Sequence, residues 1–178
     1  MLAVTAGLWR GELLGLRWED VDLESGTLQV RRTLSEPKGG YVFEAPKSGE
    51  GRQVRLTRRA VAALKEHRRR QLEERMRDVE FWQDHGLVFP STVGTPLSGG
   101  NLTRAFKAAL KRAGLPAGTR FHDLRHTCAT LLLRQGVNPK FVQDLLGHAD
   151  ISLTLNVYSH VLPDMGGIAA GAMDDALG

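Results

Sequence analysis

The spacing of hydrophobic and polar positions changes near residue 57 and divides the chain into two parts. In the first part, residues 10–18 have the apolar spacing of a short amphipathic helix. Three later segments alternate polar and apolar side chains or are rich in β-branched residues, and turn-rich breaks at 37–40 and 48–51 separate them: residues 27–34, 41–45 and 53–56. This order predicts a small three-stranded antiparallel sheet near the N-terminus, built as a meander.

Helical spacing dominates the second part. Thr57 is suited to cap a long charged helix, whose apolar positions are Val61, Leu64, Leu72 and Met76. Ser98 is suited to cap a second helix that runs to Arg112. A third has its expected buried stripe at Phe121, Leu124, Cys128, Leu131 and Leu132 and ends at Gly136.

Two more helices are expected before the C-terminal tail. Asn138 and Pro139 stand at the cap and first position of one, and Gly147 closes it. Ser152 opens a last short helix that bears Tyr158. The tail is not expected to form a strong helix, because each of its three glycines costs about 1 kcal/mol in a helix interior. The predicted fold class is α+β, mainly α, in one domain over residues 1–178.

Composition restricts the classes of protein that fit. With 42% hydrophobic and 25% charged residues and no apolar run near the roughly 20 residues of a membrane span, the chain is expected to have no membrane partner. Cys128 is the single cysteine and cannot form an intramolecular disulfide. We therefore expect a cytoplasmic protein.

The net charge of +4 favours a polyanionic partner, and the cations gather between residues 52 and 77. The segment holds Arg52, Arg55, Arg58, Arg59, Lys65, Arg68, Arg69, Arg70, Arg75 and Arg77 against Glu66, Glu73 and Glu74. A solvated helix face explains such a run as well. Because arginine suits bidentate phosphate contacts, we favour nucleic acid and predict DNA contacts at Arg52 and Arg55.

His122 and Arg125 are three residues apart on the predicted helix and share a face that points away from its buried stripe. An arginine holds two phosphate oxygens while a histidine exchanges a proton near neutral pH, so the pair suits a phosphate. His126 opens a zinc alternative, but no Glu general base lies between the two histidines and Arg125 would repel a cation. We expect no metal and no cofactor.

Three motifs occur in a fixed order: HDLRH at 122–126, LLGH at 145–148 and the terminal Tyr158. This set resembles the catalytic domain of the tyrosine recombinases, the phage integrase family. GELLGLRWEDVDL at 11–23 resembles the family's first motif region, and Pro46, Lys47 and Ser48 resemble its β-hairpin lysine segment. The resemblance covers nearly the whole chain and implies a homo-oligomer, a tetramer in the family, on double-stranded DNA.

The resemblance also implies a role for each residue. Tyr158 attacks the scissile phosphate and becomes joined to a DNA 3′ end, so that resealing needs neither ATP nor metal. Arg125 and His148 stabilise the phosphate oxygens in the transition state. Lys47 protonates the departing 5′ oxygen, and His122 assists proton transfer.

The chain departs from the family pattern at the first motif, where the family has a second phosphate-binding arginine. The run GLWRGE at 7–12 places Trp9 in that position. Arg10 is one residue on, a rotation of about 100° on a helix, and is expected to face elsewhere. The chain is also expected to lack the family's preceding helix and N-terminal DNA-binding domain, and its glycine-rich tail speaks against docking on a neighbouring protomer.

Four functions follow from these features. The first is a site-specific DNA recombinase acting through Tyr158, with activity impaired by Trp9. The second is a catalytically defective DNA-binding remnant of an integrase. A relaxing activity like that of type IB topoisomerases is the third, and a nuclease fits least because the sequence has no carboxylate cluster for a metal.

Overall fold

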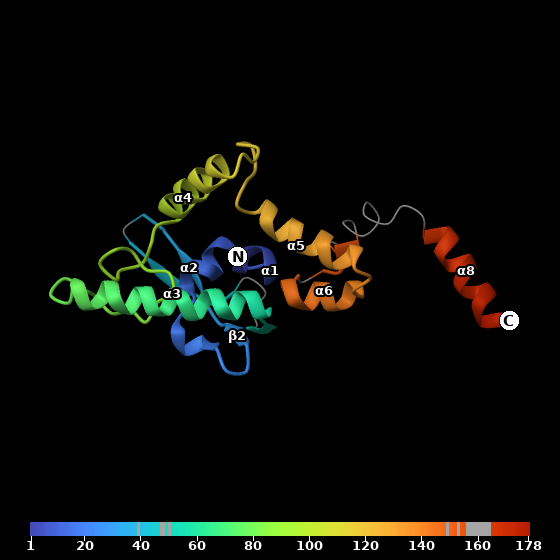
Figure 1. The fold of residues 1–178 in the computed structure, drawn as a ribbon, viewed down its shortest axis with the longest axis horizontal. Coiled ribbons are helices and arrows are strands. Elements are labelled where there is room, and N and C mark those ends of the chain that lie inside the picture. The colour runs from blue at the N-terminus through green and yellow to red at the C-terminus, as the bar shows by residue number, and fades with distance from the viewer. Residues whose placement is uncertain (39, 47–48, 50, 149, 153, 156–164) are drawn as a thin grey trace.

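The computed structural model describes residues 1–38, 40–46, 49, 51–148, 150–152, 154–155 and 165–178. Its helices are α1 (Leu2–Thr5), α2 (Arg10–Gly15), the 3-10 helix η1 (Trp18–Asp20), α3 (Arg58–Arg77), α4 (Gly99–Arg112), α5 (Asp123–Arg134), α6 (Pro139–Leu146) and α8 (Met165–Leu177). Its strands are β1 (Val21–Asp22), β2 (Thr27–Val30), β3 (Thr33–Ser35), β4 (Val42–Glu44) and β5 (Arg52–Arg55). The predicted mainly helical fold with a small antiparallel sheet is confirmed (Figure 1).

The strands pair differently from the predicted meander. β2 lies between β1 and β5 in a three-stranded antiparallel sheet, with Leu28 opposite Val21 and Val54. β3 and β4 form a separate two-stranded sheet. The predicted single strand over 27–34 is therefore wrong: it is interrupted at Arg31 and Arg32.

The interruption has a local electrostatic reason. Asp20 at the end of η1 is buried, and its carboxylate lies 3.0 Å from Nη1 of Arg32 and 3.7 Å from Nη1 of Arg31. Two consecutive residues that both turn toward one carboxylate cannot alternate across a pleated strand. The chain therefore leaves the first sheet here and starts the second.

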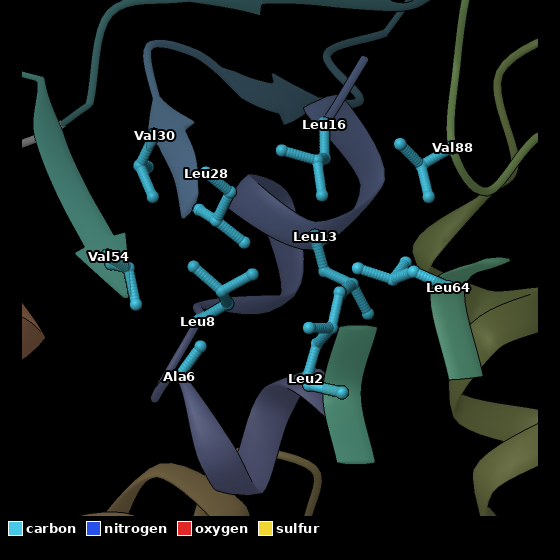
Figure 2. Close-up of a cluster of buried hydrophobic side chains, with 11 residues drawn as sticks. Leu2, Ala6, Leu8, Leu13, Leu16, Leu28, Val30, Val54, Leu64 and Val88 are labelled. Atoms are coloured by element: carbon cyan, nitrogen blue, oxygen red, sulfur yellow. The ribbon is translucent and has the colours of Figure 1, made fainter. Parts of the chain in front are cut away.

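The main core lies between the three-stranded sheet and the helices α1, α2 and α3. Figure 2 shows Leu8 and Leu13 between Val54 of the sheet and Leu64 of α3. A smaller cluster joins α5 and α6 and consists of Cys128, Ala129, Leu133, Val142 and Leu146. The prediction that Cys128 is a core residue is confirmed, because only 2% of its surface is exposed.

Three predicted helix starts are confirmed by their caps, whereas the helix predicted over residues 10–18 ends at Gly15. The Oγ1 of Thr57 accepts a hydrogen bond from the backbone N–H of Ala60, and the Oγ of Ser98 accepts one from Asn101. The Oδ1 of Asn138 likewise accepts from Lys140, with Pro139 in the first turn of α6. These side chains satisfy N–H groups that have no partner inside the helix.

The buried faces of two helices differ from the predictions. Met76 of α3 is 79% exposed and Leu72 is 49% exposed, because α3 continues past the core, while Gln71 is buried and donates to the backbone O of Leu87. On α5, Leu131 is 50% exposed, and Cys128, Ala129 and Leu133 form the buried side instead. Packing of α1 and α6 against α5, rather than the apolar pattern, selects this side.

The tail also differs from its prediction, since α8 is helical over Met165–Leu177. The helix propensity of glycine is only modestly unfavourable. The alanine, methionine and leucine residues of this segment favour a helix and offset it. In Figure 1, α8 stands apart from the helices α5 and α6. No helix in the described part of the chain has both the length and the apolar character that a membrane span requires.

Candidate functional site

A cavity of about 710 Å³ opens where segments far apart in the sequence meet. Its walls come from the start of α2, from α4, from the connection between α4 and α5, and from the end of α6. The lining residues include Trp9, Arg10, Pro46, Lys107, Arg120, His122, Gly147 and His148. The sequence motifs at 7–12, 122–126 and 145–148 are thereby brought together around one space.

Arg125 lies beneath this cavity and not on an outward face. It is 2% exposed, and its two Nη groups donate to the backbone O of Gly7 at 2.6 Å and of Leu146 at 2.5 Å. Its Nε is buried without a hydrogen-bond partner among the described atoms. Burial and the nearby charge of Arg52 lower the pKa of Arg125 to about 10.

The prediction that Arg125 points out of the core is therefore wrong. The face it shares with His122 is covered by the turn after α1, where Gly7 has a φ of +60°. A side chain at position 7 would also collide with Leu146. Glycine thus lets the backbone carbonyl come close enough to receive the guanidinium.

Trp9 covers Arg125 from the cavity side. The guanidinium carbon of Arg125 lies 4.7 Å from the centroid of the Trp9 ring, a cation–π contact. The same indole stacks on His122, with ring centroids 4.5 Å apart and an interplanar angle of 18°. A phosphate can reach Arg125 from the cavity only after this indole moves aside.

His148 follows the left-handed Gly147, whose φ is +66° and which ends α6. Its Nδ1 lies 2.9 Å from the Oγ1 of Thr154, which is fully buried. Burial and the charge of Arg125 lower the pKa of His148 to about 4, so the ring is neutral at neutral pH. When Nδ1 accepts the hydroxyl hydrogen of Thr154, Nε2 carries the ring hydrogen and can donate it.

His122 is partly buried, and its ring meets His126 edge-on at 4.6 Å. Burial, His126 and Arg125 lower the pKa of His122. In the part of the chain that the structure describes, no group of three or more His, Cys, Asp or Glu side chains is placed to hold a metal ion. Arg125 lies beside the two histidines and would repel a cation there.

A buried ion pair fixes the walls of the cavity relative to one another. Nη1 and Nη2 of Arg52 donate to the two carboxylate oxygens of Glu12 at 2.6 and 2.8 Å, and its Nε donates to the backbone O of Leu145 at 2.8 Å. The carboxylate also accepts the backbone N–H of Trp9 at 2.9 Å. β5, α2 and the end of α6 are therefore tied at one point.

This pairing corrects the predicted role of Arg52. Its side chain is 10% exposed and its donors are occupied inside the protein, so it cannot serve as a surface DNA contact. Arg55, three residues further along β5, is exposed. Along this strand, alternate side chains point to opposite faces, and position 54 is buried in the core.

The arginine-rich helix α3 is largely a solvated face with internal pairs. Arg69 pairs with Glu66 and Glu73, and Arg75 pairs with Asp84. Arg55, Arg58 and Arg59 are exposed, and no ion pair involves them within the described residues. These three, near the start of α3, keep their side chains available for an anion.

Two predicted site residues, Lys47 and Tyr158, lie outside the described residues. Pro46, next to Lys47 in the sequence, is buried and lines the cavity. The sequence contains no signal that points to Thr154 as the partner of His148. It placed Glu12 in the first motif without a role, and only the structure pairs it with Arg52.

This mainly helical domain, with an arginine and two histidines gathered at one cavity, has the architecture of tyrosine recombinase catalytic domains. The chain belongs to the phage integrase family, whose family model matches residues 1–165. The predicted family is thereby confirmed.

Three similar proteins illustrate the relationship. The tyrosine recombinase XerC-like protein of Caldanaerobacter subterraneus subsp. tengcongensis is 38% identical, over 98% of this chain and 48% of the relative. Prophage integrase IntR of Escherichia coli K12 is 34% identical, over 92% of this chain and 42% of the relative. The chain therefore spans about half the length of the curated relatives it matches. The Tn1549 transposon integrase, solved in complex with circular intermediate DNA, matches with a TM-score of 0.78 and 26% identity, over 97% of this chain and 57% of that chain.

Proposed function

We propose that this chain is the catalytic domain, over residues 1–178, of a site-specific DNA recombinase that cleaves and rejoins DNA strands. The observation that carries the proposal is the meeting of the three motif regions around one cavity, with Arg125, His122 and His148 at its base and wall. Membership of the phage integrase family supports the same chemistry.

In the proposed reaction the Tyr158 oxygen attacks the scissile phosphorus and displaces the DNA 5′ oxygen. The phosphate stays joined to the 3′ end as a phosphotyrosine, so one ester bond replaces another. Lys47 gives a proton to the leaving 5′ oxygen. Attack by a 5′ hydroxyl on the phosphotyrosine reverses these steps and reseals a strand, which leaves no requirement for a cofactor.

His148 suits a neutral hydrogen-bond donor to a phosphate oxygen. Its low pKa keeps the ring uncharged. The hydrogen bond between Nδ1 and Thr154 fixes the orientation of the ring, which leaves Nε2–H to donate to the phosphate. His122 would assist proton transfer as a neutral base at the cavity wall. Arg125 would supply the positive charge once Trp9 has moved.

The partners proposed are double-stranded DNA and further copies of the chain in a tetramer, acting in the cytoplasm. The Tn1549 integrase and its circular intermediate DNA support DNA as the partner. Arg55, Arg58 and Arg59 are the proposed contacts to the DNA backbone outside the cavity.

A suicide-substrate experiment tests the activity. The chain is incubated, in EDTA, with a library of nicked duplexes whose arms carry randomised sequence, and SDS-resistant protein–DNA adducts are collected. We expect adducts with the wild-type chain and none with Tyr158→Phe, which lacks only the attacking oxygen. Failure to form any adduct, in a chain that still binds the library, contradicts the proposed catalytic activity.

Trp9 favours a second candidate function, that of a defective DNA-binding remnant. It occupies the position of an arginine and shields the remaining one, whose exposed fraction is 2%. Restoring the cation with Trp9→Arg distinguishes the two functions. Loss of one preorganised donor typically costs about 10²- to 10³-fold in rate, so a gain of this size in adduct formation marks a site crippled by Trp9. If the wild-type chain already forms adducts and Trp9→Arg forms them at the same rate, the chain is not a defective remnant.

A further inference from the structure

Trp9 presents a partly exposed indole to the cavity. His122 stacks on the indole, and the guanidinium carbon of Arg125 lies over the same ring at 4.7 Å from its centroid. The side chain nevertheless keeps 45% of its surface exposed, and it lines the cavity. An indole that keeps nearly half of its surface exposed beside a cavity of about 710 Å³ can take a flat aromatic group.

The other walls of this cavity carry positive charge. Nζ of Lys107 donates to the backbone O of Ala117 at 2.5 Å and of Thr119 at 2.7 Å, which uses two of its three N–H donors. Arg10 packs beside Gly99 and forms no ion pair or side-chain hydrogen bond with the described residues. The carboxylate that lines the cavity, Glu12, is already neutralised by Arg52.

Arg10 differs here from the sequence-based expectation. Its guanidinium lies beside Gly99 at the start of α4 and lines another wall of the same cavity. The cavity thus combines an aromatic platform with two cations that have unused donors. A nucleotide has the complementary parts, since its base has a flat π face and its phosphates are anionic.

We propose that this cavity binds one unstacked nucleotide of the DNA, with its base on the exposed surface of Trp9 and its phosphates toward Arg10 and Lys107. The proposal rests on the proposed function, because it takes DNA as the ligand. Stacking of a base on an aromatic side chain changes affinity by about 5- to 150-fold and tolerates any base. Extruding the base costs least when it is already unpaired.

The experiment uses the full chain and two labelled 30-bp duplexes that are identical except at one extra nucleotide. In one duplex this nucleotide is an unpaired 2-aminopurine, and in the other it is an abasic residue. Fluorescence anisotropy at fixed salt gives both affinities, and quenching of 2-aminopurine reports stacking. The variants are Trp9→Ala and Trp9→Phe, with Phe81→Ala as the matched control, because Phe81 is an aromatic residue that is 68% exposed and does not line the cavity.

We expect the wild-type chain to prefer the base-containing duplex by about 5- to 150-fold and to quench its fluorescence. Trp9→Ala should lose the preference, and Trp9→Phe and Phe81→Ala should retain most of it. A wild-type chain that binds both duplexes equally, or a folded Trp9→Ala that keeps the preference, overturns the nucleotide site and leaves the proposed function standing. If Trp9→Ala does not fold, the quenching decides: a wild-type chain that binds the base-containing duplex without quenching 2-aminopurine overturns the nucleotide site. A folded wild-type chain that binds neither duplex overturns both proposals.

Discussion

The indole of Trp9 lies stacked on the imidazole of His122, with 4.5 Å between the ring centroids. One contact therefore joins Trp9, which stands where the family resemblance predicts an arginine, to the first histidine of the HDLRH motif. The stack removes water from one side of His122 and covers the guanidinium of Arg125. We therefore expect the ionisation of His122 and the access of a phosphate to Arg125 to depend on this aromatic side chain.

Trp9→Ala should raise the pKa of His122. Burial is the largest cause that lowers this pKa, and removing the indole returns water to the ring. A pH titration followed by NMR of the imidazole signals should show His122 titrating at a higher pH than in the parent. An unchanged midpoint would mean that the charges of His126 and Arg125, and not the indole, control His122.

His148 should make the protein lose stability as the pH falls from about 6.5 to about 4. Its pKa is lowered from 6.5 to about 4 in the folded state, so the unfolded chain binds more protons within this window. Stability therefore rises with pH across the window and gains nothing from this group above it. Urea unfolding at several pH values measures the slope, which His148→Gln should reduce. His85→Gln is the control and should keep the slope, because His85 is exposed and is not among the charged groups that lower the pKa of His148.

Glu12→Ala should lower the free energy of unfolding by about 3–5 kcal/mol, because it leaves the charge of Arg52 buried without its partner. The double variant Glu12→Ala with Arg52→Met should recover part of this loss. The exposed pair between Lys140 and Asp144 is the matched control, and Asp144→Ala should cost less than about 1 kcal/mol. Equal losses for Glu12→Ala and Asp144→Ala in urea unfolding would contradict the buried pair.

Gly147→Ala should destabilise the protein more than Gly114→Ala. Both glycines have a φ near +65°, where a side chain costs about 1–2 kcal/mol. Around Gly114 no atom lies within 4 Å of an added Cβ, but at Gly147 the Cδ of Arg52 would be 3.1 Å away. Thermal unfolding should therefore separate the two variants, and adduct formation should fall only in Gly147→Ala, whose next residue is His148. Equal unfolding midpoints for the two variants would show that the Arg52 side chain moves away from the added Cβ without an energetic cost.

Arg55→Ala should make DNA binding less sensitive to salt, whereas Arg69→Ala should not. Arg55 is exposed without an ion pair among the described residues, so it can release counterions on contact with phosphate. Arg69 is already occupied by Glu66 and Glu73. A plot of log affinity against log salt should lose about one unit of slope in Arg55→Ala. Equal slopes for the two variants would place the DNA away from the start of α3.

Local signals predicted the helices well, because a cap acts over three or four residues. Thr57, Ser98, Asn138 and Gly147 begin or end helices where the sequence places them. Strand pairing was predicted less well, since it depends on partners far along the chain. The turn of Arg31 and Arg32 toward the buried Asp20 splits one predicted strand, and no nearby residue signals it.

The sequence by itself determined the family, the mainly helical fold and the candidate chemistry, because motif order and helix caps are properties of neighbouring residues. It also determined that Trp9 stands where an arginine is expected. Only the tertiary structure decided that Arg125 is buried under this indole, and that Arg52 serves Glu12 instead of DNA. Those outcomes depend on which segments fold over a given helix face, and burial by such segments decides whether a charged side chain meets solvent, a ligand or another part of the protein.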